Sequence, residues 1–156
     1  MNRYAVSLVV IAAGLLAIFF YARQESVESG SPELTKMVSM PADIDLSTTR
    51  LSYLKKYIVS VASNLDPVAI NQMHSWQMLV KTADGGLVND AKVTLVGGMP
   101  MHQHGMPTAP RMTKKLGEGQ YLVEGMKFSM AGWWEIKIKV DAEPGPDNVT
   151  FNFIFR

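Results

Sequence analysis

Residues 133–156 read WWEIKIKVDAEPGPDNVTFNFIFR, and this stretch decides the fold class. Apolar and charged residues alternate along residues 134–140, and large apolar residues alternate again along residues 149–155. The Pro-Gly-Pro triplet at residues 144–146 separates the two runs. A two-residue period is typical of a strand with one buried face, and proline with glycine indicates a turn. The stretch therefore predicts two strands joined by a turn, with Trp133 on the outward face.

The same alternation recurs upstream of this stretch. Glycine-containing turns at residues 83–86 and 117–119 separate the runs, and no segment after residue 50 has a convincing helical period. Six or seven short strands with polar outward faces are typical of two packed antiparallel sheets. We therefore expect an all-β antiparallel β-sandwich over residues 51–156. The expected inward residues are Tyr57, Val59, Val61, His74, Trp76, Met78, Val80, Ala91, Val93, Leu95, Tyr121 and Val123.

Composition excludes several classes of protein. The 156 residues include 15 Lys and Arg against 14 Asp and Glu, a net charge of +1, so we expect no nucleic-acid partner. There is no cysteine, which excludes disulfides, thiolate zinc sites and cysteine nucleophiles. No serine stands in a nucleophile-elbow context and no acidic pair is placed for catalysis, so we do not expect an enzyme. Methionine, with 11 residues against 3 His, is the excess that needs explaining.

The N-terminus predicts a membrane anchor. Residues 4–21 read YAVSLVVIAAGLLAIFFY, without a charge. As a helix this run would be about 27 Å long, close to the thickness of the hydrocarbon core. The competing interpretation is a cleaved signal peptide, but no good cleavage site follows. We expect an uncleaved single transmembrane helix within residues 1–22, a polar tether over residues 23–50, and the folded domain outside the cytoplasm.

Residues 97–107, GGMPMHQHGMP, concentrate the rare side chains. Proline after Met99 and after Met106 favours extended backbone at both positions. In extended backbone, residues two apart face the same way. His102, His104 and Met106 are therefore expected to project together, with Met101 adjacent.

This set of donors suits copper. Thioethers select Cu(I), and imidazole suits either oxidation state of copper. Thioether is a poor zinc ligand, and three His in the whole chain are few for zinc. Outside the cytoplasm thiols are readily oxidised, so using Met in place of Cys is consistent with copper handling there.

Each candidate ligand also has a purely structural interpretation. Residues 99–106 could form a Met-rich loop packed on the sandwich, and His74 is either a ligand or a hydrogen-bonded core histidine. Met130 is expected to pack in the core more than to bind metal, because methionine is a common gap-filler. The same core-packing interpretation applies to Met73, Met78, Met112 and Met126.

The motifs together resemble the YtkA-like family, which is related to FixH-type proteins. The resemblance covers about residues 50–156, and the GMPMHQHG run at residues 98–105 carries most of it, with HSW at 74–76 and GMKFSMAGWWE at 125–135. It implies a bacterial, extracytoplasmic, immunoglobulin-like domain anchored by an N-terminal lipid or helix. Relatives are associated with copper handling and with assembly of haem-copper oxidases. The positions matching the recurrent Met/His pattern are His74, Met99, Met101, His102, His104 and Met130.

Two functional hypotheses follow. The first is a copper-binding protein in the bacterial cytoplasmic membrane, with its domain on the periplasmic or extracellular side. It would hold or deliver Cu(I) to a membrane metalloenzyme such as a respiratory oxidase. The alternative is a structural accessory subunit of a membrane complex that binds no metal, which an outward Trp133 would suit.

Overall fold

The computed structural model of the protein describes residues 39–156. The membrane anchor expected within residues 1–22 lies outside the described residues, as does the tether up to residue 38. Over residues 39–156, no helix has the length and apolar character needed to cross a membrane.

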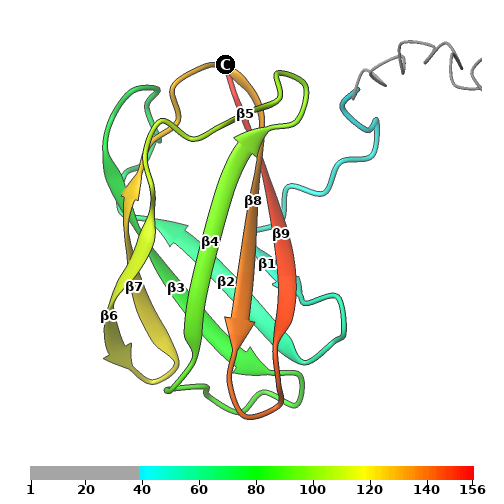
Figure 1. The fold of residues 1–156 in the computed structure, drawn as a ribbon, viewed down its shortest axis with the longest axis vertical. Helices are drawn as coiled ribbons and strands as arrows, with labels where there is room; N and C mark the ends of the chain where they lie inside the picture. Colours follow the sequence, from blue (N-terminus) through cyan, green and yellow to red (C-terminus); the bar gives the residue numbers. More distant parts are fainter. Residues whose placement is uncertain (1–38) are drawn as a thin grey trace, which may run out of the picture. The chain divides into compact units, whose positions relative to one another are not determined.

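Residues 39–156 form nine strands in two antiparallel sheets (Figure 1). One sheet has the order β1-β2-β3-β7-β6 and the other β5-β4-β8-β9. Buried side chains from both sheets make one hydrophobic core. The expected all-β antiparallel architecture is therefore confirmed for this part of the chain. The strands are β1 (Thr49–Leu51), β2 (Tyr57–Ser63), β3 (His74–Thr82), β4 (Lys92–Met99), β5 (His104–Gly105), β6 (Arg111–Gly117), β7 (Gln120–Met126), β8 (Gly132–Asp141) and β9 (Asp147–Phe155).

The two-residue period correctly predicts which side chains form the core. In β8, Ile136, Ile138 and Val140 are buried, whereas Lys137 and Lys139 between them are exposed. The expected inward residues of the other strands are buried as well. Apolar area removed from water contributes about 25 cal/mol per Å², so these alternating faces are the main driving force for pairing the sheets.

Three features differ from the sequence-based expectation. The sequence pattern does not predict β6, because its side chains are exposed at nearly every position and show no apolar alternation. β1 begins at Thr49, just inside the segment expected to be tether. Trp133 faces away from the core as expected but is only 6% exposed, and its Nε1 donates to Asn152 Oδ1 at 3.0 Å. Asn152 in turn donates to the backbone oxygen of Asp45 at 3.1 Å.

A buried carboxylate closes one end of the sandwich. Asp147, 2% exposed, accepts hydrogen bonds from the backbone N–H groups of Leu54 at 2.9 Å, Asn148 at 2.7 Å and Lys56 at 3.4 Å. Burial by itself raises the pKa of Asp147. The hydrogen bonds from these amides and from the Ser52 hydroxyl outweigh burial and hold the pKa below its usual value.

We expect Asp147→Ala to lower the free energy of unfolding by about 2 to 4 kcal/mol near neutral pH, because buried N–H groups lose their acceptor. A lowered folded-state pKa gives stability that is present above the unfolded pKa and is lost as pH falls toward the folded one. Denaturant unfolding between about pH 7 and about pH 3 should therefore show a smaller loss on acidification in Asp147→Ala than in the parent.

Asp141→Ala is the matched control, because Asp141 is an exposed aspartate at the end of β8. It should leave both the stability and its pH dependence close to the parent's. Equal effects of the two substitutions would show that Asp147 does not anchor this end.

Candidate metal site at the Met/His end

One end of the sandwich gathers the rare residue types. β3 and β8 begin there and β4 and β7 end there, at the upper end in Figure 1. The loops at residues 64–73, 100–110 and 127–131 therefore lie at this end, which we call the Met/His end. All three His of the chain lie there. The described methionines at this end are Met73, Met99, Met101, Met106, Met112, Met126 and Met130.

A series of ring contacts connects the three histidines. His102 and His104 have ring centroids 5.9 Å apart in a stacked arrangement. His104 and Trp134 form a T-shaped pair with ring centroids 6.0 Å apart. Trp134 contacts Phe128 at 5.3 Å, and Phe128 contacts His74 at 5.6 Å. The structure thus brings His102 and His104 together directly, whereas Phe128 and Trp134 connect this pair to His74.

The loop between β4 and β5 is a tight turn. The backbone oxygen of Met99 accepts hydrogen bonds from the N–H groups of His102 at 3.0 Å and Gln103 at 2.9 Å. Gln103 has a φ of 55°, in the left-handed region. The continuous extended stretch expected over residues 99–106 is therefore wrong at residues 100–103, because two amides close onto one carbonyl. His102 approaches His104 through this turn.

Two histidines are held through Nδ1 by backbone carbonyls. His104 Nδ1 lies 3.0 Å from the oxygen of Gly105, and His74 Nδ1 lies 3.1 Å from the oxygen of Gln72. A carbonyl only accepts, so we assign the proton to Nδ1 in each ring, which leaves the Nε2 lone pair free. Metal-binding histidines commonly have this arrangement, with the other ring nitrogen donating to a carbonyl.

The sulfur atoms of the loop differ in accessibility. Met101 is 51% exposed, whereas Met99 is 1% exposed. The Met99 methyl lies close to Gly132, 2.9 Å from where a Cβ would stand. Met106 is partly buried, and its sulfur lies over Gly97 in β4. Met101 therefore carries the accessible thioether, and the other two pack against the sandwich.

The methionines outside this loop also divide into buried and exposed side chains. Met78 and Met126 are fully buried, and Met112 packs partly buried against the core, as expected for core-packing side chains. Met73 and Met130 are 58% and 45% exposed, so the core-packing interpretation of these two is wrong. Their exposure follows from their position in the turns that flank β3 and β8.

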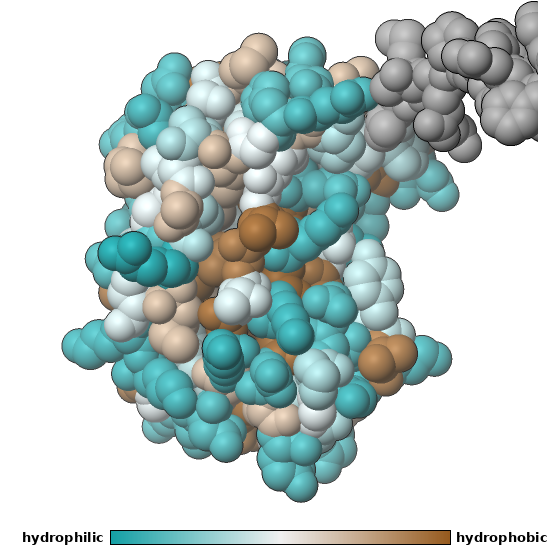
Figure 2. Space-filling model, in the orientation of Figure 1, coloured by the Kyte–Doolittle hydropathy of each residue, from teal (hydrophilic) through white to brown (hydrophobic). Residues whose placement is uncertain are grey.

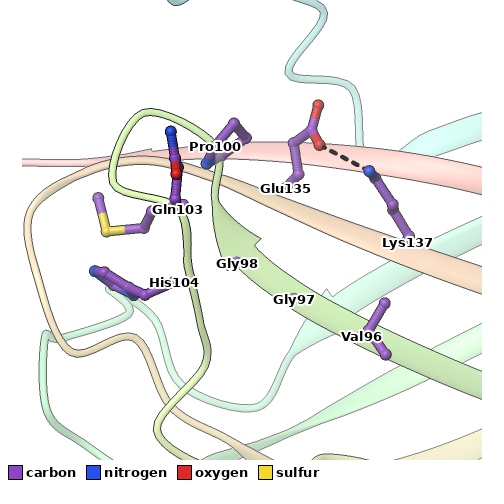
Figure 3. Close-up of a pocket in the computed structure, with 9 residues that line it drawn as sticks. Val96, Gly97, Gly98, Pro100, Gln103, His104, Glu135 and Lys137 are labelled. Atoms are coloured by element: carbon purple, nitrogen blue, oxygen red, sulfur yellow. Dashed lines mark ion pairs between the residues drawn. The ribbon is translucent and has the colours of Figure 1, made fainter. Parts of the chain in front are cut away.

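A shallow hollow of about 290 Å³ lies beside the loop (Figure 3). It is bordered by Glu135 and Lys137, which form an ion pair at 3.4 Å on the outward face of β8. His104 borders the hollow, but its ring contacts Trp134, whose side chain is buried. The face that carries β4 and β8 shows an apolar area near its middle, within a largely hydrophilic surface (Figure 2). Val96, also in β4, is 67% exposed.

Carboxylates do not complete the donor set. In the part of the chain that the structure describes, no group of three or more His, Cys, Asp or Glu side chains could hold a metal ion. The other side chains at this end with donors suited to a soft metal ion are the methionines.

Fold and site define the class of this protein: an antiparallel β-sandwich domain with histidines and methionines gathered at one end. A model of the YtkA-like family matches residues 54–139, more than half of the chain. The chain belongs to the YtkA-like family. The match spans β2 to most of β8 and includes all three histidines.

No curated protein matches the chain. The chain is similar to a solved structure of the "ZirS C-terminal Domain", with a TM-score of 0.38 and 12% sequence identity over 78% of this chain and 80% of that one.

Gly97 gives a direct test of the packing beneath the loop. A Cβ there would lie 2.5 Å from Ile136 Cδ1 and 2.6 Å from Met106 Sδ. We therefore expect Gly97→Ala to displace Met106 and to lower the free energy of unfolding by about 1 to 3 kcal/mol, measured by denaturant unfolding. Gly105→Ala is the control, because a Cβ there meets only Gly97 O at 3.5 Å. Equal stability of the two variants would contradict close packing of Met106 on β4.

Proposed function

We propose that this protein is a membrane-tethered, extracytoplasmic copper-binding protein that holds or delivers Cu(I) at the Met/His end. The ligands are His102, His104 and at least one thioether of the same loop. The observation that carries the proposal is the direct contact of the two imidazoles, 5.9 Å between ring centroids, next to the half-exposed Met101. We propose binding and transfer of the ion without catalysis.

The geometry of the pair suits one shared ion. Metal–imidazole bonds are about 2.0 Å long, so two nitrogens on one ion lie at most about 4 Å apart. Ring centroids 5.9 Å apart are compatible with that separation. Both rings are exposed, and the His104 ring is oriented by its Nδ1 contact with the Gly105 carbonyl. Neutral donors leave the charge of Cu(I) uncompensated, which favours reversible holding.

The accessible sulfur donor is Met101. Met106 is close to β5 but needs a rotamer change to release its sulfur from Gly97. Met99 is the least accessible of the three because it is buried against Gly132. Met130, exposed in the loop before β8, is a further candidate at the same end. The His74 ring contacts Phe128, which connects it to the loop only through Trp134.

The segment before β1 lies at one end of the sandwich. β1 runs antiparallel to β2, and β2 ends at the Met/His end. Leu46 lines a hollow together with Ile70 and the C-terminal residues Phe155 and Arg156. The chain therefore enters the sandwich at the end that carries the histidines. We propose that an anchor helix within residues 1–22 holds this immunoglobulin-like domain at the bacterial cytoplasmic membrane, on the periplasmic or extracellular side.

The alternative is a structural accessory subunit that binds no metal. An exposed Trp133 would favour this function, because it could contact a partner protein. In the structure, however, Trp133 is buried and hydrogen-bonded to Asn152. The exposed Met73, Met101 and Met130 could equally contact another protein. Only the first function requires the protein to bind copper, so a measurement of copper binding distinguishes the two.

We expect replacement of both His102 and His104 by Ala to abolish Cu(I) binding by the loop, measured by anaerobic competition titration of the full-length chain. Protons compete with metal for imidazole nitrogen, so binding by the parent should weaken as pH falls. Met101→Leu should weaken binding at nearly unchanged volume. Met40→Leu is its control, since Met40 is similarly exposed but outside the loop.

Unchanged Cu(I) affinity and stoichiometry in the double histidine variant would exclude the loop as a copper site. The loop would then be a packing element, and the accessory-subunit function would be favoured. If Met40→Leu and Met101→Leu weakened binding equally, Met101 would not be a ligand.

Residues 1–22 should remain in the mature protein, because residues 4–21 are uncharged over a length that spans the hydrocarbon core and lack a credible cleavage site. Intact-mass measurement of the protein extracted from bacterial membranes checks this. A mature chain that begins near residue 23 would show a cleaved signal peptide instead.

A further inference from the structure

We propose that His74 and Met126 form a second, enclosed Cu(I) site behind the loop of the Met/His end. This inference rests on the proposed function in one respect, the identity of the metal. The donors themselves belong to β3 and β7 of the other sheet and are independent of the loop.

The first argument is the free nitrogen of His74. The side chain is buried, with 6% of the residue exposed, and Nε2 has no hydrogen-bond partner within residues 39–156. Leaving a buried polar atom unpaired costs about 1 to 3 kcal/mol. A core position that needed only apolar packing would be more stable with an apolar residue. The Gln72 carbonyl at Nδ1 fixes the ring so that Nε2 carries the lone pair, as in many histidines that bind metal.

The second argument is the residue paired with His74. Met126 is its register partner at the end of β7, next to a bulge that interrupts the register between His74 and Ser75. In a regular pair, opposed residues have Cβ atoms about 4.5 to 5.5 Å apart, and a methionine side chain is long enough to reach across a pair next to a bulge. Met126 is fully buried, so both side chains face the core. The site would therefore offer one imidazole nitrogen and one thioether, both neutral and both suited to Cu(I).

The third argument is separation from the loop. Phe128 contacts the His74 ring at 5.6 Å and Trp134 at 5.3 Å, and of these two rings Trp134 contacts His104. The ring contacts therefore connect His74 to the histidines of the loop through two aromatic side chains, and we assign the two sets of donors to separate ions. The inner donors are buried, whereas the outer histidines are exposed. An accessible site next to an enclosed one would let the domain receive an ion at the loop and retain it inside.

The test is the Cu(I) stoichiometry of the full-length chain, measured anaerobically with a competing chelator. The parent should bind two ions per chain and the His102/His104 double alanine variant one. Adding His74→Leu to the double variant should remove that remaining ion. Met126→Leu in the double variant should weaken its binding, because Leu conserves the volume but lacks sulfur. Met78→Leu is the matched control, since Met78 is equally buried in β3, and should leave binding unchanged.

A stability measurement separates loss of a ligand from loss of the fold. His74→Leu removes the unpaired nitrogen, so the copper-free variant should unfold at the same temperature as the parent or higher. It should also lose the increase in unfolding temperature that Cu(I) gives the His102/His104 double variant, because a bound ligand stabilises only the state that binds it.

The outcomes distinguish this inference from the proposed function. If the double variant binds no Cu(I) while the parent binds one ion, the inner site is refuted and the loop site stands. If the double variant keeps its ion after His74→Leu, His74 is a core histidine and the inference fails. If the parent binds one ion that is lost only through His74→Leu, the inner site stands and the loop site fails.

Discussion

The Met/His end depends on the indole of Trp134. This side chain is fully buried, and its Nε1 donates to the backbone oxygen of Met130 at 3.0 Å, which holds the loop before β8. One part of its surface packs against Phe128 in the core and another contacts the ring of His104 in β5. Replacing a buried Trp by a small residue typically costs about 3 to 5 kcal/mol, and here the substitution would free two loops at once. Trp134 thus couples the stability of the sandwich to the position of the histidines.

Around this indole, the side chains from the two sheets differ in their exposure to solvent. The sheet containing β4 and β5 contributes exposed imidazoles in a short turn, where exchange with solvent is easy. The sheet containing β3 and β7 contributes His74 and Met126, which are enclosed. Both sheets contribute neutral imidazole and thioether groups at this end, and the two sets differ in their exposure to solvent. A soft monovalent ion pays less for desolvation than a divalent one, and neutral ligands suit an apolar surrounding.

The sequence predicts the fold well because a two-residue period reports directly which side chains are buried. This holds for β8, where Ile136 and Ile138 alternate with lysines, and fails for the edge strand β6, whose exposed residues have no apolar face. The candidate site is harder to predict. The contact of His102 with His104 depends on a turn that uses a positive φ at Gln103, which is rare outside glycine. The link from His104 to Phe128 through Trp134 joins distant segments, and no local pattern encodes it.

Leu46, shortly before β1, lines the same hollow at the Met/His end as Phe155 and Arg156. Domains whose termini are adjacent tolerate insertion into other proteins and tandem duplication, because the junction disturbs little of the fold. If a second copy of residues 46–156 were joined at Arg156, its first strand would start near the Met/His end of the first copy. Duplication of this segment alone would therefore place two methionine-rich ends close together.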